Sequence, residues 1–234
     1  MSFADLSFLF YFLPAFFAVY YIVPGAWKNG VLVLGSLAFY FFGAGMRDTL
    51  LLLAAVLLHY ALARMMGGRG RAARRLLLLL ALAADLYCLV FFKYAGFLLE
   101  NVGILTGKDY PAAALTLPLG VSFYLFQSAG YLIDVYRGEE AERSLMRYAA
   151  FTLAFPQLVM GPILRYREWR APLRARTLSR TDAELGFELF CLGLCCKVLL
   201  ADQLAPLWAA IERIGYEYIS TPLAWLGAVG YSLQ

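Results

Sequence analysis

Residues 117 to 139 read LPLGVSFYLFQSAGYLIDVYRGE, and the interpretation of the whole chain starts from this stretch. It is apolar enough to cross a bilayer, which takes about 20 residues of helix. Yet Gln127 lies near its middle, and Asp134 follows about two turns later on the same helical face. A polar stripe that faces lipid is unstable. This face is therefore predicted to meet other helices or water.

The composition extends that prediction to the whole chain. Hydrophobic residues make up 62% and charged residues only 15%, and the mean hydropathy is +0.69, whereas a soluble domain carries about 25% charge. The sequence therefore predicts an all-α, polytopic membrane protein. The net charge of +4 comes mostly from arginines in short loops, which indicates membrane topology and anionic headgroups. No motif for nucleic acid accompanies it.

Apolar helices are predicted between polar turns along the chain. Their approximate ranges are 6–23, 30–42, 49–66, 76–99, 117–136 and 183–204, and a further segment begins near Pro222. The first apolar helix lacks the features of a cleaved signal peptide, and we expect it to remain in the protein as an uncleaved helix. Arginines gather at residues 64–75, which marks the cytoplasmic side and puts the N-terminus outside. No repeat or linker divides the chain, so one membrane domain over residues 1–234 is expected.

The segment at residues 148–163 conflicts with a simple count of spans. If this segment crossed the membrane completely, the arginines of residues 165–180 would lie outside. Basic residues disfavour that side of the membrane. Pro156, Gly161 and Pro162 also interrupt the helical pattern, and a broken backbone at membrane depth is tolerated only inside protein or beside water. We therefore predict a broken, re-entrant segment that returns to the cytoplasmic side. Tyr166 and Trp169 are expected to anchor it at the interface.

Few residues suit acid and base catalysis. The one histidine, His59, lies inside an apolar helix with no nucleophile beside it, and a packed or interfacial residue is favoured over a catalytic base. The cysteines lie in apolar segments, and neither histidine nor a second cysteine pair completes a metal site. No catalytic residue and no metal ligand is therefore predicted within the chain.

Polar residues at membrane depth give the best indication of a binding site, because burying them is costly. For Gln127, packing between helices and lining of a pathway are equally favoured. Asp134 is one turn from Arg137, so a local ion pair is the alternative to a binding role. The candidate binding residues are Gln127, Asp134, Arg137, Gln157, Arg165 and Arg167.

Several of these stretches together resemble one known family. The quoted stretch followed by AFPQLVMGPILRY at 154–166 is similar to the alginate O-acetyltransferase branch of the membrane-bound O-acyltransferases. FFKYAGF at 91–97 and KVLLAD at 197–202 agree in order and spacing, and so do the first two helices. The resemblance covers nearly the whole chain.

The resemblance implies a helical funnel through which an acyl group, expected to be acetyl, passes toward an exported polysaccharide or another envelope acceptor. It implies a phosphorylated donor such as acetyl-CoA or an acyl carrier protein, a bacterial inner membrane and a periplasmic or extracellular acyltransferase partner. Arg165 and Arg167 would attract such a donor, although a topology signal explains both arginines equally well.

The resemblance also implies a catalytic histidine in a Trp-His motif that follows the stretch corresponding to GYSLQ at 230–234. That motif is not present, and His59 matches no such motif. The chain is therefore expected to be the N-terminal half of an acyltransferase, truncated within a helix and inactive by itself. A membrane transporter and a non-catalytic assembly subunit are the alternatives, since broken helices and polar residues at mid-membrane occur in transporters too.

Overall fold

The computed structural model describes residues 3–107, 116–159, 161–176, 179–214 and 218–233. These residues form helices joined by turns, with no strand among them. Two helical stretches, Gly25–Met66 and Arg71–Thr106, are long and apolar enough to cross a membrane. The prediction of an all-α membrane protein is confirmed.

The chain divides into two compact units, which are described one at a time. The first is Phe12–Arg176, and the second combines Ser2–Tyr11 with Thr177–Gln234. The expectation of one membrane domain stays a prediction.

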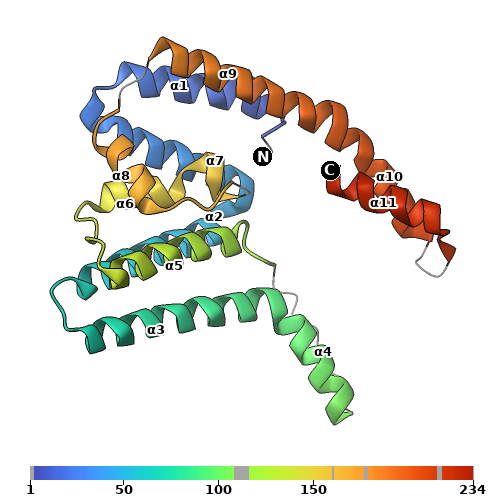
Figure 1. Cartoon of the computed structure of the whole chain (residues 1–234), viewed down its shortest axis with the longest axis horizontal. Coiled ribbons are helices and arrows are strands. Elements are labelled where there is room, and N and C mark those ends of the chain that lie inside the picture. Colours follow the sequence, from blue (N-terminus) through green and yellow to red (C-terminus); the bar gives the residue numbers. More distant parts are fainter. Residues whose placement is uncertain (1–2, 108–115, 160, 177–178, 215–217, 234) are drawn as a thin grey trace. The chain divides into compact units, whose positions relative to one another are not determined.

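The first unit holds most of the helices (Figure 1). They are α1 (Leu13–Ile22), η2 (Gly25–Trp27), α2 (Lys28–Met66), α3 (Arg71–Leu89), the π-helical turn η3 (Val90–Tyr94), α4 (Ala95–Thr106), α5 (Val121–Arg137), α6 (Leu145–Leu153), α7 (Phe155–Leu158) and α8 (Tyr166–Arg174). A further π-helical turn, η1 (Phe8–Phe12), precedes α1. Every apolar helix predicted in this range is present.

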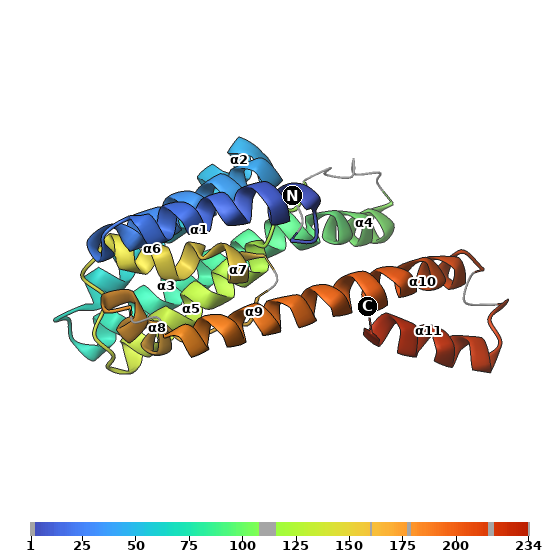
Figure 2. The same cartoon turned by 90° about the horizontal axis from the view of Figure 1, so that it is seen from above.

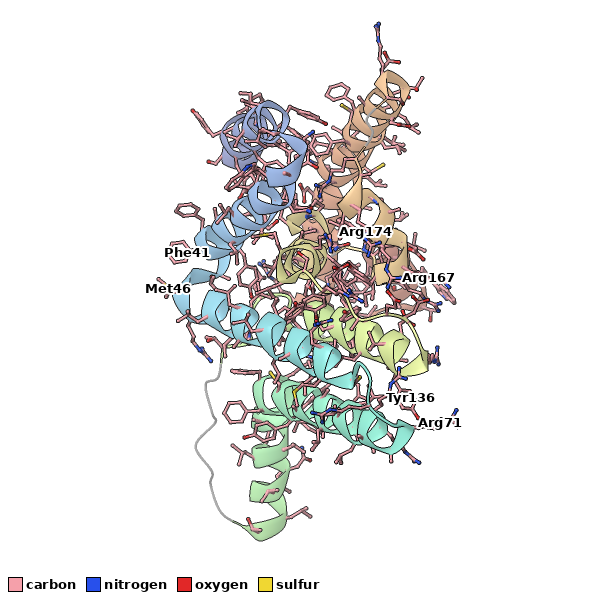
Figure 3. The ribbon with its side chains drawn as sticks, turned by 90° about the vertical axis from the view of Figure 1, so that its left-hand side faces the viewer. Phe41, Met46, Arg71, Tyr136, Arg167 and Arg174 are labelled. Atoms are coloured by element: carbon pink, nitrogen blue, oxygen red, sulfur yellow. The ribbon has the colours of Figure 1, made fainter. Side chains whose placement is uncertain are left out.

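Helix α2 is interrupted at Gly45, where φ is 84° and ψ is 178°. This conformation is essentially restricted to glycine, and it ends the helical path. The chain changes direction there, between Phe41 and Met46 (Figure 3). Thr49 Oγ1, one turn further along, donates to Gly45 O at 2.8 Å. The two helices predicted at 30–42 and 49–66 are thus confirmed, with a sharper turn than the sequence indicated.

The core of the first unit lies where α2 packs against α5 and α6, with α3 against α5. Its largest side chains, which include Tyr40, Leu52, Leu132 and Tyr148, are fully buried. Outside this core many leucines are exposed, as at Leu76 on α3. Such apolar surface suits contact with lipid better than contact with water.

Hydrogen bonds define two polar ends of the first unit. At one end Tyr40 Oη donates to Leu119 O at 2.6 Å, and Arg47 donates to Thr116 Oγ1 at 2.7 Å. We call the residues 45–48 and 116–120 the kink end. At the other end Tyr60 Oη donates to Arg143 O at 2.6 Å. We call the loops 67–70 and 138–144, the adjoining start of α3 and end of α5, and α8 the arginine-rich end.

The segment from α6 to α8 leaves the arginine-rich end and returns to it. Helix α6 stops where Ala154 takes φ −48° and ψ 111°, just before Pro156. The segment reaches the kink end, because a Cβ added to Gly120 would lie 2.7 Å from Leu158 O. The chain then comes back, so that Tyr166 Oη donates to Glu142 Oε2 at 2.6 Å. The predicted break is confirmed, and the chain returns to the end that it left; the return to one side of the membrane stays a prediction.

The second unit contains α9 (Arg180–Cys195), the π-helical turn η4 (Cys196–Ala201), α10 (Asp202–Ile214) and α11 (Thr221–Leu233). Ser179 and Asp182 form a capping box at the start of α9. Helices α10 and α11 lie side by side (Figures 1 and 2), and the ring centroids of Trp208 and Tyr231 are 4.8 Å apart.

The sequence placed the end of the helix at 183–204 before Pro206, and this boundary is wrong. The helix continues through Pro206 to Ile214. A proline removes one helical hydrogen bond, and the packing of Ile211 beside Gly227 of α11 stabilises the continuation.

The return of the chain can be tested by labelling single cysteines in a variant without the native cysteines. Arg167→Cys and Arg71→Cys should react with a membrane-impermeant thiol reagent from the same side, because both lie at the arginine-rich end. Arg47→Cys at the kink end, which is also exposed, is the matched control and should react from the opposite side. Reaction of Arg167→Cys from the side of Arg47→Cys would show that the segment crosses the membrane.

Candidate functional site

A buried histidine and a buried aspartate join α2 to α3. His59 is 1% exposed and Asp85 is 7% exposed. His59 Nδ1 lies 2.8 Å from Ala55 O, and because a carbonyl oxygen only accepts, Nδ1 carries a hydrogen. His59 Nε2 lies 3.0 and 3.1 Å from the two carboxylate oxygens of Asp85. His59 Nε2 is thus within hydrogen-bonding distance of the Asp85 carboxylate.

His59 is thus packed inside the protein, as the sequence analysis favoured. Its partner, Asp85, was not assigned from the sequence. Both of its ring nitrogens are occupied by bonds within the protein. A general base needs a free nitrogen within reach of the proton that it removes. His59 therefore stabilises the contact between α2 and α3.

Two predicted residues, Gln127 and Gln157, meet at the break in the re-entrant segment. Phe155 N, which would bond to Phe151 O in a continuous helix, donates to Ser36 Oγ at 3.1 Å instead. Phe151 O accepts from Gln127 Nε2 at 3.2 Å and from Gln157 Nε2 at 2.5 Å. The two amides thereby replace the hydrogen bond that the break removes.

Gln157 keeps one polar atom without a partner. Its side chain is 5% exposed, and Oε1 accepts no hydrogen bond from any residue that the structure describes. An unpaired buried acceptor costs about 1 to 3 kcal/mol. Gln127 and Gln157 therefore have a clear packing role, and their part in substrate binding stays a prediction.

A buried carboxylate organises the arginine-rich end. The side chain of Glu142 is 1% exposed. Its Oε1 accepts from Arg147 Nη2 at 2.6 Å and from the backbone nitrogens of Arg143 and Ser144 at 2.8 and 2.9 Å. Its Oε2 accepts from Tyr166 Oη at 2.6 Å. This one carboxylate therefore joins the loop at 138–144, α6 and α8.

The same hydrogen bonds determine the charge of Glu142. Burial alone would raise the pKa of its carboxyl, but the hydrogen bonds from Arg147, Tyr166 and Ser144 outweigh burial and lower the pKa to about 2. For Tyr166, burial and the negative neighbour both raise the pKa of the phenol. Glu142 is therefore ionised, and Tyr166 keeps the proton that it donates.

Two basic cavities open at the arginine-rich end. One of about 320 Å³ is lined by Glu140, Ala141, Glu142, Arg143, Arg147, Arg170 and Arg174. Another of about 300 Å³ is lined by Arg71, Arg74, Tyr136 and Arg137. Cavities rich in guanidinium groups bind carboxylates and phosphates through paired hydrogen bonds.

The other predicted residues lie at this same end. Arg137 lines the second cavity, and the exposed Arg167 shares a small hollow with the half-buried Asp134. Arg165 is exposed at the start of α8. Asp134 and Arg137 make no ion pair in the described part of the chain, which removes the local pair as an explanation of Asp134.

The sequence did not single out Glu142. It lies among Glu139 and Glu140 in a loop of mixed charge, where a solvated side chain is the ordinary expectation. The serine that follows it at 144 caps α6 by accepting from Arg147 N at 3.4 Å, and this cap motif is the only local signal of an ordered loop.

The described residues contain no group of three or more histidine, cysteine, aspartate or glutamate side chains that could hold a metal ion. At the arginine-rich end, guanidinium groups can bind anions, while Tyr131 Oη accepts from Glu142 N and Tyr166 Oη donates to the Glu142 carboxylate.

No protein-family model matches the chain, but curated proteins do. It is 38% identical over 243 residues to a probable alginate O-acetylase AlgI of Azotobacter vinelandii, with 100% of this chain and 48% of that protein covered. The corresponding protein of Pseudomonas aeruginosa is 37% identical, with 100% and 46% covered. A peptidoglycan O-acetyltransferase of Helicobacter pylori is 30% identical over 263 residues, with 97% and 49% covered. The chain spans about half the length of these relatives.

The contact between His59 and Asp85 can be tested by thermal unfolding in detergent. Asp85→Ala should lower the free energy of unfolding by about 3 kcal/mol, because it leaves a buried histidine nitrogen unpaired. Asp85→Asn should lose only about 1 kcal/mol, because its amide can donate to Nε2. A negligible loss in Asp85→Ala would show that the contact contributes nothing to stability, and equal losses in the two variants would show that an amide cannot replace the carboxylate.

The buried carboxylate predicts a stability that depends on pH. Because the pKa of Glu142 is lower in the folded protein than its ordinary value of 4.5, its contribution is complete above about pH 4.5 and is lost as the pH falls toward 2. Glu142→Gln should therefore cost about 3 kcal/mol at pH 7, and the difference from the unmodified protein should shrink between pH 4.5 and 2.

The measurement for Glu142 is the unfolding midpoint of both proteins across that pH range. Glu140→Gln is the matched control, because Glu140 is exposed in the same loop, and it should leave the pH profile unchanged. A difference between Glu142→Gln and the unmodified protein that persists at pH 2 would contradict the assignment.

Proposed function

The chain belongs to the membrane-bound O-acyltransferase family, in the branch of the alginate O-acetylases, and on this basis we propose that it forms part of an enzyme that transfers an acyl group, expected to be acetyl, to an exported polysaccharide or another cell-envelope acceptor. The observation that carries the proposal is similarity along the entire chain. The family and the helical fold support it together.

The acceptor that we propose first is alginate, because relatives with that printed function are 35 to 38% identical. Peptidoglycan is the second candidate, which the relative at 30% identity favours. Both acceptors present hydroxyl groups to the same kind of acyl transfer. A choice between them rests on which polymer gains ester-linked acetate.

We propose that the arginine-rich end faces the cytoplasm of a bacterium, with the chain spanning the inner membrane several times. Basic residues favour that side. An acyl donor such as acetyl-CoA or an acyl carrier protein bears phosphate groups, and the basic cavities suit such groups. Gln127, Asp134, Arg137, Gln157, Arg165 and Arg167 remain the residues that we propose to serve the donor or its path.

The catalytic step is proposed to use residues of the whole protein outside this chain. His59 is unsuitable as a general base, because Ala55 O and Asp85 occupy both of its nitrogens. The chain would supply membrane helices, the re-entrant segment and the donor-facing end, and it is expected to be inactive by itself. A periplasmic or extracellular acyltransferase is the proposed partner protein.

The test is to express the whole protein that contains this chain in an alginate-producing bacterium without its own alginate O-acetylase. Ester-linked acetate should return to the exported alginate. Peptidoglycan from the same cells is analysed in parallel, and acetate found only there would favour the second acceptor. If neither polymer gains acetate while the protein is present in the membrane, the proposed function is wrong.

A further inference from the structure

The cavity of about 320 Å³ beside Glu142 has a wall in which basic groups outnumber acidic groups. We call it the Glu142 cavity. Its charged lining residues are Glu140, Glu142, Arg143, Arg147, Arg170 and Arg174. Arg174 lies apart from Arg71 and Tyr136, which line the other basic cavity (Figure 3). The two cavities are therefore separate, and each is judged by its own contacts.

The guanidinium group of Arg147 is held in one orientation by a buried partner. Its Nε and Nη2 donate to Glu142 Oε1 at 3.1 and 2.6 Å. The Glu142 side chain is 1% exposed, and two backbone nitrogens of its loop and Tyr166 Oη also donate to it. These contacts use only part of the N–H groups of the guanidinium. Because 31% of the Arg147 side chain is exposed, the other N–H groups can serve a ligand in the cavity.

Two further arginines of the Glu142 cavity have donors that the protein does not use. The side chain of Arg143 is exposed and forms no ion pair with a described carboxylate. Arg174 Nη2 lies 3.9 Å from Glu142 Oε2, which is beyond hydrogen-bonding distance, and 56% of its side chain is exposed. Arg170, by contrast, is paired at 3.3 Å with a carboxylate of the loop before α6. Arg143, Arg147 and Arg174 therefore keep donors for a ligand.

A phosphate group is an anion that suits this arrangement. Guanidinium groups bind phosphate oxygens through paired, charged hydrogen bonds. An arginine that a carboxylate already holds loses less side-chain freedom when it binds an anion, so its contact is stronger. Arg165 and Arg167 are exposed and make no ion pair with a described carboxylate. The Glu142 cavity is thus better prepared for phosphate than the exposed arginines at the start of α8.

We propose that the Glu142 cavity binds a phosphate group of the acyl donor through Arg143, Arg147 and Arg174, and that Glu142 is the positioning residue that holds Arg147 for this contact. The identity of the anion rests on the proposed function, but the binding itself requires no acyl transfer. The phosphate can belong to coenzyme A or to the phosphodiester of an acyl carrier protein. Both sources present the same chemistry to the arginines.

The experiment measures equilibrium binding to the whole protein that contains this chain, purified in a neutral detergent. Coenzyme A and holo acyl carrier protein are titrated separately, which identifies the source of the phosphate. The variants are Glu142→Gln and the double variant Arg143→Gln with Arg174→Gln, whose two side chains are exposed. The matched control is Arg69→Gln with Arg75→Gln, because these exposed arginines of the same end line neither basic cavity.

At least one of the two ligands should bind, and the variants should change its affinity in a defined order. The double variant should bind about 30-fold more weakly than the unmodified protein, because it loses two charged hydrogen-bond donors. The control variant, which removes the same amount of charge, should stay within about 3-fold. Glu142→Gln should bind about tenfold more weakly, because Arg147 is no longer held.

The sign of the effect of Glu142→Gln tests the positioning role. If Glu142 acted only through its charge, its removal would strengthen the binding of an anion. If Glu142 only stabilised the fold, the melting temperature would fall while the affinity of the folded variant, measured below that temperature, stayed unchanged. Either result would overturn the positioning role. If Glu142→Gln does not fold, Arg147→Lys, which keeps the charge but loses the paired contact, replaces it and should also bind about tenfold more weakly.

The site itself is tested by the ligands and the double variant. Absence of binding by both ligands, or an unchanged affinity in the folded double variant, would show that the Glu142 cavity is not the phosphate site. The proposed function is tested separately by the ester-linked acetate on exported alginate. Return of that acetate without binding at the cavity would reject the site alone, and binding without acetate would reject the function alone.

Discussion

A backbone carbonyl at membrane depth must find a donor within the protein, and this constraint shapes the re-entrant segment. The break at Ala154 and Pro156 takes the ordinary partner away from Phe151 O, and two glutamine amides from different parts of the chain replace it. Ser36 receives the displaced Phe155 N. The chain can therefore turn back between α6 and α8 without leaving Phe151 O or Phe155 N unpaired.

The arginine-rich end depends on a second constraint, the cost of a buried charge. Glu142 is ionised within the protein only because Arg147, Tyr166 and backbone nitrogens surround its carboxylate. The same contacts hold α8 beside α6 and therefore determine where the segment between these two helices returns. One residue in a loop thus connects the topology of the chain to the location of its basic cavities.

These features describe a helical body with a positively charged end, and we propose that this end receives a phosphorylated acyl donor. The His59 and Asp85 pair fits a stabilising role in that body, because its hydrogen bonds are directed into the protein. An acyltransferase needs its catalytic groups directed toward donor and acceptor. The proposed division of roles between this chain and the remainder of the whole protein rests on that difference.

The sequence by itself determined most of the helices and the break in the segment between α6 and α8, and it marked the stretches in which the arginines gather. These are local properties, since hydropathy, proline, glycine and charge act within a few residues. It also marked Gln127 and Gln157 as residues that must avoid lipid. Only the tertiary structure decided that both amides bond to one carbonyl, that His59 meets Asp85 and that Glu142 is buried. Those partners are distant along the chain, and packing alone brings them within hydrogen-bonding distance.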